Sequence, residues 1–415
     1  MAAPSVFSNG VFVPPDSIFD VTRRYVSDAC ADKVNLGQGT YRDENGQPWV
    51  LPSVRMAKES LLDAGHEYLP IAGLPQFRDA AMRLVFHETK ALEENRLIWM
   101  LEILTSPWVA SCQSVSGTGA LLLAGLTLKK ANCSAKTVYI TDPTWSNHGL
   151  LFSSIGFDVK TLPYYKDGSF DFERYVEALE AADDEAALVL HACAHNPTGC
   201  DPSREQWRRI GEIVKQKRIF PIFDSAYLGF NSGSVDEDAW AIRYFVDDLG
   251  LEACVCMSFA KSMGLYGERV GLTAMVASSE DAARTVGSIL ANSQRATISN
   301  PPVYGARIAA AVLDTPEIAE QWKKDLVTMS SRILAMRRRL FDELQALQTP
   351  GNWSHIISQS GMFGYMGISP TQISHLETKY HIYMADTSRI SMAGLNDGNV
   401  KYVAQALDDT VRTIV

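Results

Sequence analysis

The sequence predicts an α/β fold with a mostly parallel sheet, on two observations. Short apolar runs alternate with helical patterns through the middle of the chain, and such alternation favours parallel strands joined by helices. Each run also ends in a polar or glycine-rich turn, which is where sites lie in sheets of this kind. Four runs have this pattern: residues 137–144, 187–199, 218–227 and 253–261.

The segments around these runs have helical periodicity. Residues 201–218 combine an Asp/Ser cap with basic residues in the last turn, which predicts a helix between two of the strands. Residues 315–347 keep the same periodicity with no glycine inside and no proline after the first turn. We expect this long helix to bridge to a second domain.

The C-terminal part predicts a smaller α+β domain. It has a strand-like run at 361–369, a helix that starts near Pro370 and a final helix after RISMAGL. Its partner is expected to be the N-terminal segment. The predicted division is an N-terminal arm with part of the small domain (1–50), a large domain (51–320) and a small C-terminal domain (321–415).

The composition excludes several classes of protein. The chain has 415 residues, of which 46% are hydrophobic, and its formal net charge of -10 argues against a nucleic-acid partner. No apolar run reaches the roughly 20 residues that span a bilayer, and the opening MAAPSVFSNG resembles neither a signal nor a transit peptide. The seven cysteines lack zinc-site spacing. We expect a cytoplasmic protein with reduced cysteines and no membrane partner.

The segment SGTGA (116–120) could hold an anion. Its small residues stand at the start of a predicted helix, where backbone N–H groups can approach a phosphate. The alternative is a simple tight turn, because no Gly-x-Gly-x-x-Gly or Walker pattern accompanies it.

Three charged residues follow or end apolar strands. Asp224 ends the run FPIFD, where burial would raise its pKa unless a cation or donors face it; alternatively it caps a helix. Lys261 follows CVCMSF and either extends to solvent or has its amine neutralised for covalent chemistry. Arg269 could clamp an anion or form a surface ion pair.

Aromatic and polar residues follow two further strands. Trp145 and Asn196 could hold a planar ring, although Trp145 could equally be packing. Histidines 148, 191 and 195 have no carboxylate or cysteine spaced with them in sequence, so we expect supporting roles rather than metal binding.

Taken in order, these motifs resemble one family, the aspartate aminotransferases among the pyridoxal-phosphate enzymes of fold type I. The resemblance covers nearly the whole chain: VNLGQGTYRDENGQPWVLPSV, HEYLPIAGLPQFR, HACAHNPTG, FDSAYLGF, SFAKSMGLYGERVG, ISNPPVYGARI and RISMAGLNDGNVKYVA. It implies a large domain with a mostly parallel seven-stranded sheet between helices, and a smaller α+β domain. It also implies transamination between L-aspartate or glutamate and 2-oxoglutarate or oxaloacetate, with pyridoxal 5'-phosphate as cofactor.

The resemblance assigns the ring contacts. Lys261 would carry the cofactor as a Schiff base and then move a proton between the substrate α-carbon and the cofactor. Asp224 would face the pyridine nitrogen and keep it protonated, which makes the ring an electron sink. Tyr227 and Asn196 would bond the phenolic oxygen, with Trp145 against the ring face.

The resemblance also assigns the anion contacts. The phosphate would be held by Ser116, Gly117, Thr118, Ser258 and Arg269, with Tyr68 reaching in from a second subunit, which implies a homodimer with shared active sites. Arg389 would bind the substrate α-carboxylate, and Arg295 of the neighbouring subunit the distal carboxylate. Gly39 would leave room for the substrate backbone, beside Trp145 and Asn196.

Two departures from the family lie near the expected substrate pocket. The position before Gly39 is usually aliphatic but is Gln38 here, and an aromatic residue usual before Ser299 is replaced by Ile298. Both departures leave the expected cofactor chemistry unchanged, but they leave open which substrate the enzyme uses. An aromatic-amino-acid or specialised-pathway aminotransferase, which shares the framework and both arginines, is the alternative.

A third departure is an insertion. Between Arg96 and Val109 this chain carries twelve extra residues, LIWMLEILTSPW (97–108). They are either a real surface element or a gene-model error such as a retained intron, and we favour the error because their removal leaves a clean join, NR-VASCQSV. Finding codons 97–108 in the mature transcript would contradict this hypothesis.

Two other functional classes remain to be separated from an active enzyme. The first is a catalytically silent cofactor-binding or interaction protein, whose visible cofactor absorbance would not bleach when an amino acid is added. The intact residues Lys261, Asp224, Arg269 and Arg389 argue against this class. A nicotinamide dehydrogenase would leave Lys261 and Asp224 without roles and lacks the dinucleotide fingerprint.

Overall fold

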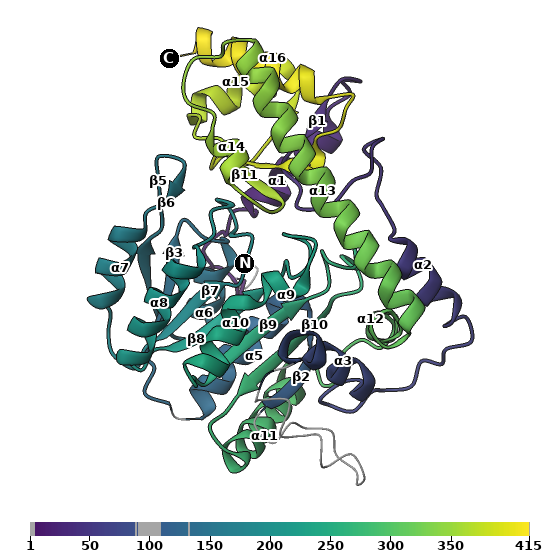
Figure 1. Ribbon diagram of the computed structural model, residues 1–415, viewed down its shortest axis with the longest axis vertical. Coiled ribbons are helices and arrows are strands. Elements are labelled where there is room, and N and C mark those ends of the chain that lie inside the picture. The colour runs from purple at the N-terminus through teal and green to yellow at the C-terminus, as the bar shows by residue number, and fades with distance from the viewer. Residues whose placement is uncertain (1–4, 88, 90–108, 132, 415) are drawn as a thin grey trace.

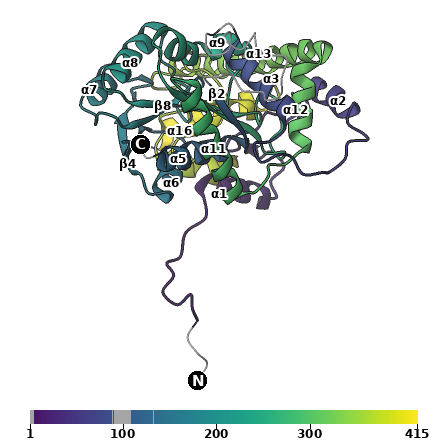
Figure 2. The ribbon, with the colours of Figure 1, turned by 90° about the horizontal axis from the view of Figure 1, so that it is seen from below.

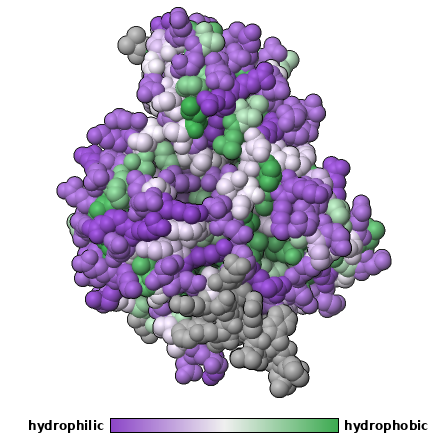
Figure 3. Space-filling view, in the orientation of Figure 1, coloured by the Kyte–Doolittle hydropathy of each residue, from purple (hydrophilic) through white to green (hydrophobic). Residues whose placement is uncertain are grey.

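The computed structural model describes residues 5–87, 89, 109–131 and 133–414, and has a larger lobe built on a sheet and a smaller lobe above it (Figure 1). The insertion at 97–108 lies outside the described residues. Hydrophilic side chains cover most of the face seen in Figure 3. None of the helices in the described residues is both long and apolar enough to cross a membrane.

The larger lobe contains a seven-stranded sheet, which confirms the predicted α/β class. β10 runs antiparallel to its two neighbours, and the other adjacent pairs are parallel. The strands, in sheet order, are β2 (Val109–Val115), β10 (Val270–Val276), β9 (Ala253–Ser258), β8 (Phe220–Ser225), β7 (Ala187–His191), β3 (Thr137–Asp142) and β4 (Asp158–Pro163).

The four predicted runs contain β3, β7, β8 and β9, and each strand ends at a polar residue of its run: Asp142, His191, Ser225 and Ser258. β9 is buried along its whole length, as expected for a strand covered on both faces. Its successive side chains point to opposite faces, so Cys254 and Cys256 join one hydrophobic core while Val255 and Met257 join the other.

Helices cover both faces of the sheet (Figure 1). α8 forms where the sequence predicts it, with a capping box in which the Ser203 side chain accepts from the Gln206 N–H and the Gln206 side chain returns the bond. α8 spans Arg204–Gln216, and the others of this lobe are α2 (Pro52–Glu59), α3 (Pro75–Phe86), α5 (Ser116–Lys130), α6 (Asn147–Ser154), α7 (Phe172–Glu180), α9 (Val235–Asp238), α10 (Trp240–Arg243), the π-helix Tyr244–Asp248, α11 (Glu280–Thr297) and α12 (Tyr304–Asp314). A small hairpin joins β5 (Tyr165–Lys166) to β6 (Ser169–Phe170).

The smaller lobe combines the two ends of the chain. β1 (Val34–Asn35) pairs in parallel with β12 (Ile382–Tyr383). This pairing agrees with the prediction that the N-terminal segment packs with the C-terminal part of the chain. β11 (Phe363–Tyr365) pairs antiparallel with β13 (Arg389–Ser391). The helices are α1 (Ser17–Ser27), α14 (His355–Ser358), α15 (Pro370–Tyr380), the 3-10 helix Met392–Gly394 and α16 (Val400–Thr413).

α13 (Pro316–Ala346) connects the lobes as the predicted long helix. It packs against α2 and α12 of the larger lobe and against α14 and α16 of the smaller lobe. The helix is continuous through residue 320, so the domain boundaries at 50 and 320 stay predictions.

The segment before α1 extends away from the folded body (Figure 2). Its apolar side chains are exposed by 80–90%, among them Val6, Phe7, Val11, Phe12 and Val13. α1 itself is capped by Asp16, whose carboxylate accepts from the N–H groups of Ile18 and Phe19.

Candidate active site

Asp224, Tyr227 and Lys261 come together at the carboxyl ends of two neighbouring strands. Asp224 is the penultimate residue of β8, Tyr227 follows that strand, and Lys261 follows β9. The Lys261 Nζ lies 5.7 Å from the centroid of the Tyr227 ring. The lysine and the carboxylate, distant in sequence, therefore face one site.

Asp224 is a buried carboxylate held in its charged form. Burial raises its pKa, but a hydrogen bond from His148 and the nearby positive charge of Lys261 are among the interactions that outweigh burial, so the pKa lies below its ordinary value. The His148 Nε2 is 3.0 Å from the Asp224 Oδ2. Asp224 belongs to β8, and the alternative that it caps a helix is therefore wrong.

Two histidines, His148 and His191, lie next to the Asp224 carboxylate. The other ring nitrogen of His148, Nδ1, lies 2.9 Å from the Thr144 Oγ1. Burial lowers the pKa of His191 to about 3, so its ring is neutral. In the sequence, no carboxylate is spaced with these histidines as in a metal site. The fold nevertheless brings Asp224 close enough to His148 and His191 for the three side chains to share a metal ion. The His148–Asp224 hydrogen bond uses one ligand atom of each, and we assign the group to hydrogen bonding.

Trp145 packs on the same group. Its ring meets His148 edge to face, with centroids 5.3 Å apart and planes at 87°. Trp145 therefore lies beside the His148–Asp224 pair, and it also packs against the hydrophobic core that contains Cys254 and Cys256.

The Lys261 amine is poised to lose its proton near neutral pH. Burial lowers its pKa to about 8, the Asp224 carboxylate opposes this shift, and the positive charges of Arg269 and Arg389 add to it. A neutral amine is the nucleophilic form of lysine.

The predicted anion site at the start of α5 lies close to the end of β9. The Ser116 Oγ is 2.9 Å from the Ser258 Oγ, and the Ser116 N–H donates to the Arg269 carbonyl oxygen at 3.2 Å. A Cβ on Gly117 would lie 3.4 Å from the Ser258 Cβ, so the helix start approaches β9 closely. No side chain caps α5, which leaves its first N–H groups, including that of Thr118, available to an anion.

Arg269 adds a cation to this predicted site. It is partly buried, burial lowers its pKa, and its Nη1 donates to the Tyr266 carbonyl oxygen at 3.1 Å. The phosphate cradle and the simple turn both stay predictions for the segment 116–120.

The opposite end of the site is built around Arg389 on β13. Its Nη2 donates to the Gly37 carbonyl oxygen at 2.9 Å, and its Nη1 donates to the Asn196 Oδ1 at 3.3 Å. Its Nε is buried without a partner in the described part of the chain, and Nη1 and Nη2 each carry a second N–H, so several donors remain for a ligand.

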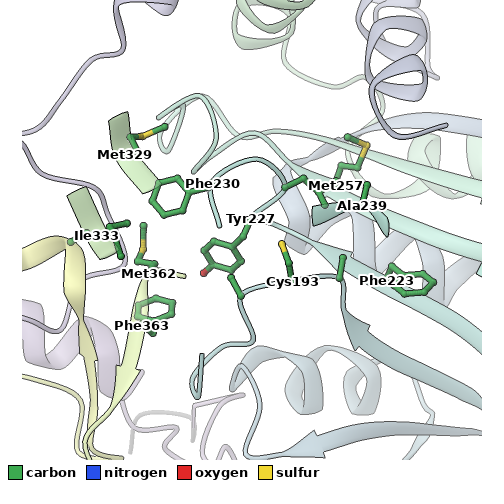
Figure 4. Close-up of a cluster of buried hydrophobic side chains, with 14 of the residues drawn as sticks. Cys193, Phe223, Tyr227, Phe230, Ala239, Met257, Met329, Ile333, Met362 and Phe363 are labelled. Atoms are coloured by element: carbon green, nitrogen blue, oxygen red, sulfur yellow. The ribbon is translucent and has the colours of Figure 1, made fainter. Parts of the chain in front are cut away.

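Phe363 is a site residue that the sequence reasoning did not single out. Its ring centroid is 4.2 Å from the Arg389 guanidinium carbon, and its ring meets that of Tyr227 at 6.3 Å and 82° (Figure 4). A Cβ on Gly39 would lie 3.0 Å from the Phe363 Cζ, so a larger residue there would require the Phe363 ring to shift. The only sequence signal was the apolar run GMFGYMGIS, which indicates a strand.

Two predicted residues lie outside this cluster. Tyr68 is 89% exposed, and Arg295, near the end of α11, donates to the Ser299 Oγ. Within the described residues of one chain, neither side chain contacts the Lys261 site.

The fold and the site define an α/β protein in which a buried lysine with a lowered pKa lies near a buried carboxylate and a buried arginine. The family model described as Aminotransferase class I and II matches residues 31–407. The cytoplasmic aspartate aminotransferase of Schizosaccharomyces pombe is 45% identical to this chain over 98% of both chains. The chain belongs to the class I and II aminotransferase family.

Solved structures agree with this assignment. Aspartate aminotransferase from the cytoplasm of Saccharomyces cerevisiae superposes with a TM-score of 0.93 at 43% identity, covering 99% of both chains. The aromatic-amino-acid aminotransferase from Burkholderia pseudomallei, covalently bound to pyridoxal phosphate, gives a TM-score of 0.91 at 37% identity, covering 98% of this chain and 100% of its own.

Proposed function

We propose that the protein is a pyridoxal-phosphate-dependent aspartate aminotransferase that exchanges an amino group between aspartate or glutamate and 2-oxoglutarate or oxaloacetate. One observation carries the proposal: the Lys261 amine, with a pKa lowered to about 8, faces the ionised Asp224 in a shared site. Amino-group transfer needs two such groups: a nucleophilic amine that binds the cofactor and a buried carboxylate that faces the ring nitrogen.

The donor set fits pyridoxal phosphate at each end. Ser116, Thr118, Ser258 and Arg269 offer hydroxyls, N–H groups and a cation to the phosphate. Asp224 offers an anion to a protonated ring nitrogen. Trp145 would lie against the ring face.

Bound pyridoxal phosphate supplies an aldehyde that condenses with amines and a ring that accepts the electron pair left by the substrate α-proton. Lys261 would hold the cofactor and then, as a free amine, carry the proton at its Nζ. Asp224, kept ionised by His148, would hold the ring nitrogen protonated. Tyr227 and Asn196 would orient the phenolic oxygen.

Arginines would select a dicarboxylate. Arg389, with its Nε free, would bind the α-carboxylate in a bidentate manner. Arg295 is exposed in one chain, which fits a role across a subunit interface with the distal carboxylate. Tyr68, 89% exposed, would reach the partner's phosphate in the same way, so we propose a homodimer with shared sites. Following the relatives' names, we place the enzyme in the cytoplasm.

A panel of amino donors against 2-oxoglutarate tests the proposal. We expect kcat/KM for aspartate and glutamate to exceed that for phenylalanine or alanine by at least about 100-fold, because a clamped second carboxylate contributes several kcal/mol. The visible absorbance of the bound cofactor should bleach when aspartate is added. A spectrum that does not respond to any amino acid would exclude an active aminotransferase.

The aromatic alternative depends on Ile298. This apolar residue directly follows α11 as its C-cap and is 39% exposed, close in sequence to Arg295 and Ser299, so it could extend an apolar wall for a ring. Preference for phenylalanine or tyrosine in the same panel would favour that alternative.

A further inference from the structure

A cavity of about 550 Å³ lies in the smaller lobe, between the segment that follows β1 and the turn that precedes α16. Gln38, Thr40 and Arg42 line one side, and Asn396 and Asn399 line the other. The described residues that line it do not include those of the Lys261 site.

The segment 37–42 separates the cavity from the active site. The Gly37 carbonyl oxygen accepts from Arg389, and Gly39 lies against Phe363. Residues 38, 40 and 42 alternate with these positions and line the cavity instead, as alternate residues of an extended segment do. Gln38, expected beside the substrate from its sequence position, therefore turns into this second space.

Arg42 brings a cation without a counter-ion into the cavity. In the part of the chain that the structure describes, its guanidinium has one hydrogen-bonding partner, the Gln38 Oε1, at 3.2 Å. The neighbouring acids are used elsewhere: Glu44 pairs with Arg332 at 2.9 Å, and the Asp43 Oδ1 accepts from two backbone N–H groups of its own turn. Most of the guanidinium donors are therefore free.

Thr40 supplies a second unsatisfied group. Its Oγ1 is buried and has no hydrogen-bonding partner among the described residues. A buried hydroxyl without a partner destabilises the fold unless a ligand or water completes it. The Gln38 amide nitrogen, whose oxygen already serves Arg42, is a third donor on the same side.

The charged side chains that line the cavity give it a net positive charge. Lys33 and Arg42 are the cations, and Asp32 is the one carboxylate among the described lining residues. The Lys33 Nζ donates to the carbonyl oxygens of Tyr25 and Asp28 at 2.9 and 2.5 Å, so it is fixed near the wall. Donors and positive charge together select an anion.

We propose that this cavity binds a small oxyanion, recognised through a carboxylate or phosphate group by Arg42, Thr40 and Gln38. Arg42 offers the planar fork that suits either group, and Thr40 gains the partner it lacks. The inference concerns a site distinct from that of the proposed transamination and does not rest on that activity.

Calorimetric titration of the cofactor-loaded enzyme with inorganic phosphate, and separately with acetate, tests the proposal. We expect saturable binding of at least one of the two, and the tighter one identifies the recognised group. Arg42→Gln should weaken that binding at least tenfold. Arg55→Gln is the matched control, because it removes one exposed positive charge from α2 without touching the cavity, and it should bind like the wild type.

Thr40→Val is a second variant of nearly equal volume that keeps the charge, and it should weaken binding about threefold or more. The thermal midpoint and cofactor spectrum of each variant establish that it is folded; if Arg42→Gln does not fold, Thr40→Val decides. No saturable binding in the wild type, or equal affinity in the wild type and the variants, overturns the proposal. Neither result bears on transamination, which the donor panel measures separately.

Discussion

The Ser360 hydroxyl donates to the Asp201 Oδ2 at 3.1 Å and joins the loop before β11 to the turn that carries Asn196. The same carboxylate accepts from the N–H groups of Ala194 and His195 at 2.7 and 2.9 Å, directly before Asn196. The position of Asn196, and through it of Arg389, thus depends on a loop of the smaller lobe.

Arg337 holds that loop, and its replacement should destabilise the protein. This arginine is 1% exposed, and it donates to the carbonyl oxygens of Ile356, Ser360 and Gly361 at 3.1, 2.9 and 2.9 Å, and to that of Phe363. Arg337→Met leaves these carbonyls without donors, so we expect the free energy of unfolding to fall by about 3 kcal/mol or more. Urea unfolding measures it.

The matched control for this prediction is Arg339→Met on the same helix. Arg339 is exposed and pairs with Asp397, and such a surface pair contributes less than about 1 kcal/mol. Equal losses for the two variants would contradict the role given to Arg337.

Lys261→Ala should abolish transamination. The substitution removes the amine that would attach the cofactor and carry the proton, and we expect kcat to fall by at least about 1,000-fold, since a positioned base alone contributes 10²–10⁴-fold. The cofactor should still bind noncovalently through the cradle around Ser116. Lys136→Ala, at an exposed lysine, is the control and should keep full activity. Wild-type turnover by Lys261→Ala would refute the assignment.

The Lys261 amine of the cofactor-free protein should titrate near pH 8. Below this pH the amine is protonated and unreactive; above it the amine is neutral and reacts with an acylating reagent, which mass spectrometry can follow at the peptide. Asp224→Asn removes the negative charge that raises the Lys261 pKa, so the midpoint should move to lower pH. An unchanged or higher midpoint would mean that Asp224 does not act on Lys261.

Arg295→Asp should change the choice of substrate. Reversing the charge at the distal end should lower kcat/KM for aspartate by at least about 100-fold while leaving neutral or basic amino acids far less affected. Arg284→Asp places the same charge change on the exposed face of α11 and should leave the ratio of substrates unchanged. Equal losses for all substrates with Arg295→Asp would argue against a distal clamp.

The sequence was most informative where strands end. The apolar runs before Asp224 and Lys261 located both residues at strand ends, because a short apolar run followed by polar residues is typical of a buried strand and its end. The capping signals around Ser203 and the uninterrupted periodicity of 315–347 likewise predicted α8 and α13, since local hydrogen bonding and helix periodicity decide them.

What the sequence could not predict depends on contacts between distant segments. No spacing links His148 to Asp224, and their hydrogen bond exists only because β8 and the start of α6 meet beyond the sheet. The antiparallel direction of β10 and the turning of Gln38 away from Arg389 are also set by packing. The expected contacts of Tyr68 with the phosphate and of Arg295 with the distal carboxylate require a second subunit, and they stay predictions.

The parallel pairing of Val34 with Ile382 constrains the order in which the protein can be completed during synthesis. Ile382 leaves the ribosome about 350 residues after Val34, which takes tens of seconds at about 5–20 residues per second. The larger lobe can assemble in that interval, while the first strand waits unpaired for the last part of the chain. A transcript truncated shortly before codon 382 would therefore yield a polypeptide that contains β9 and Lys261 but lacks both the strand that pairs with β1 and the Arg389 side chain that donates to Gly37.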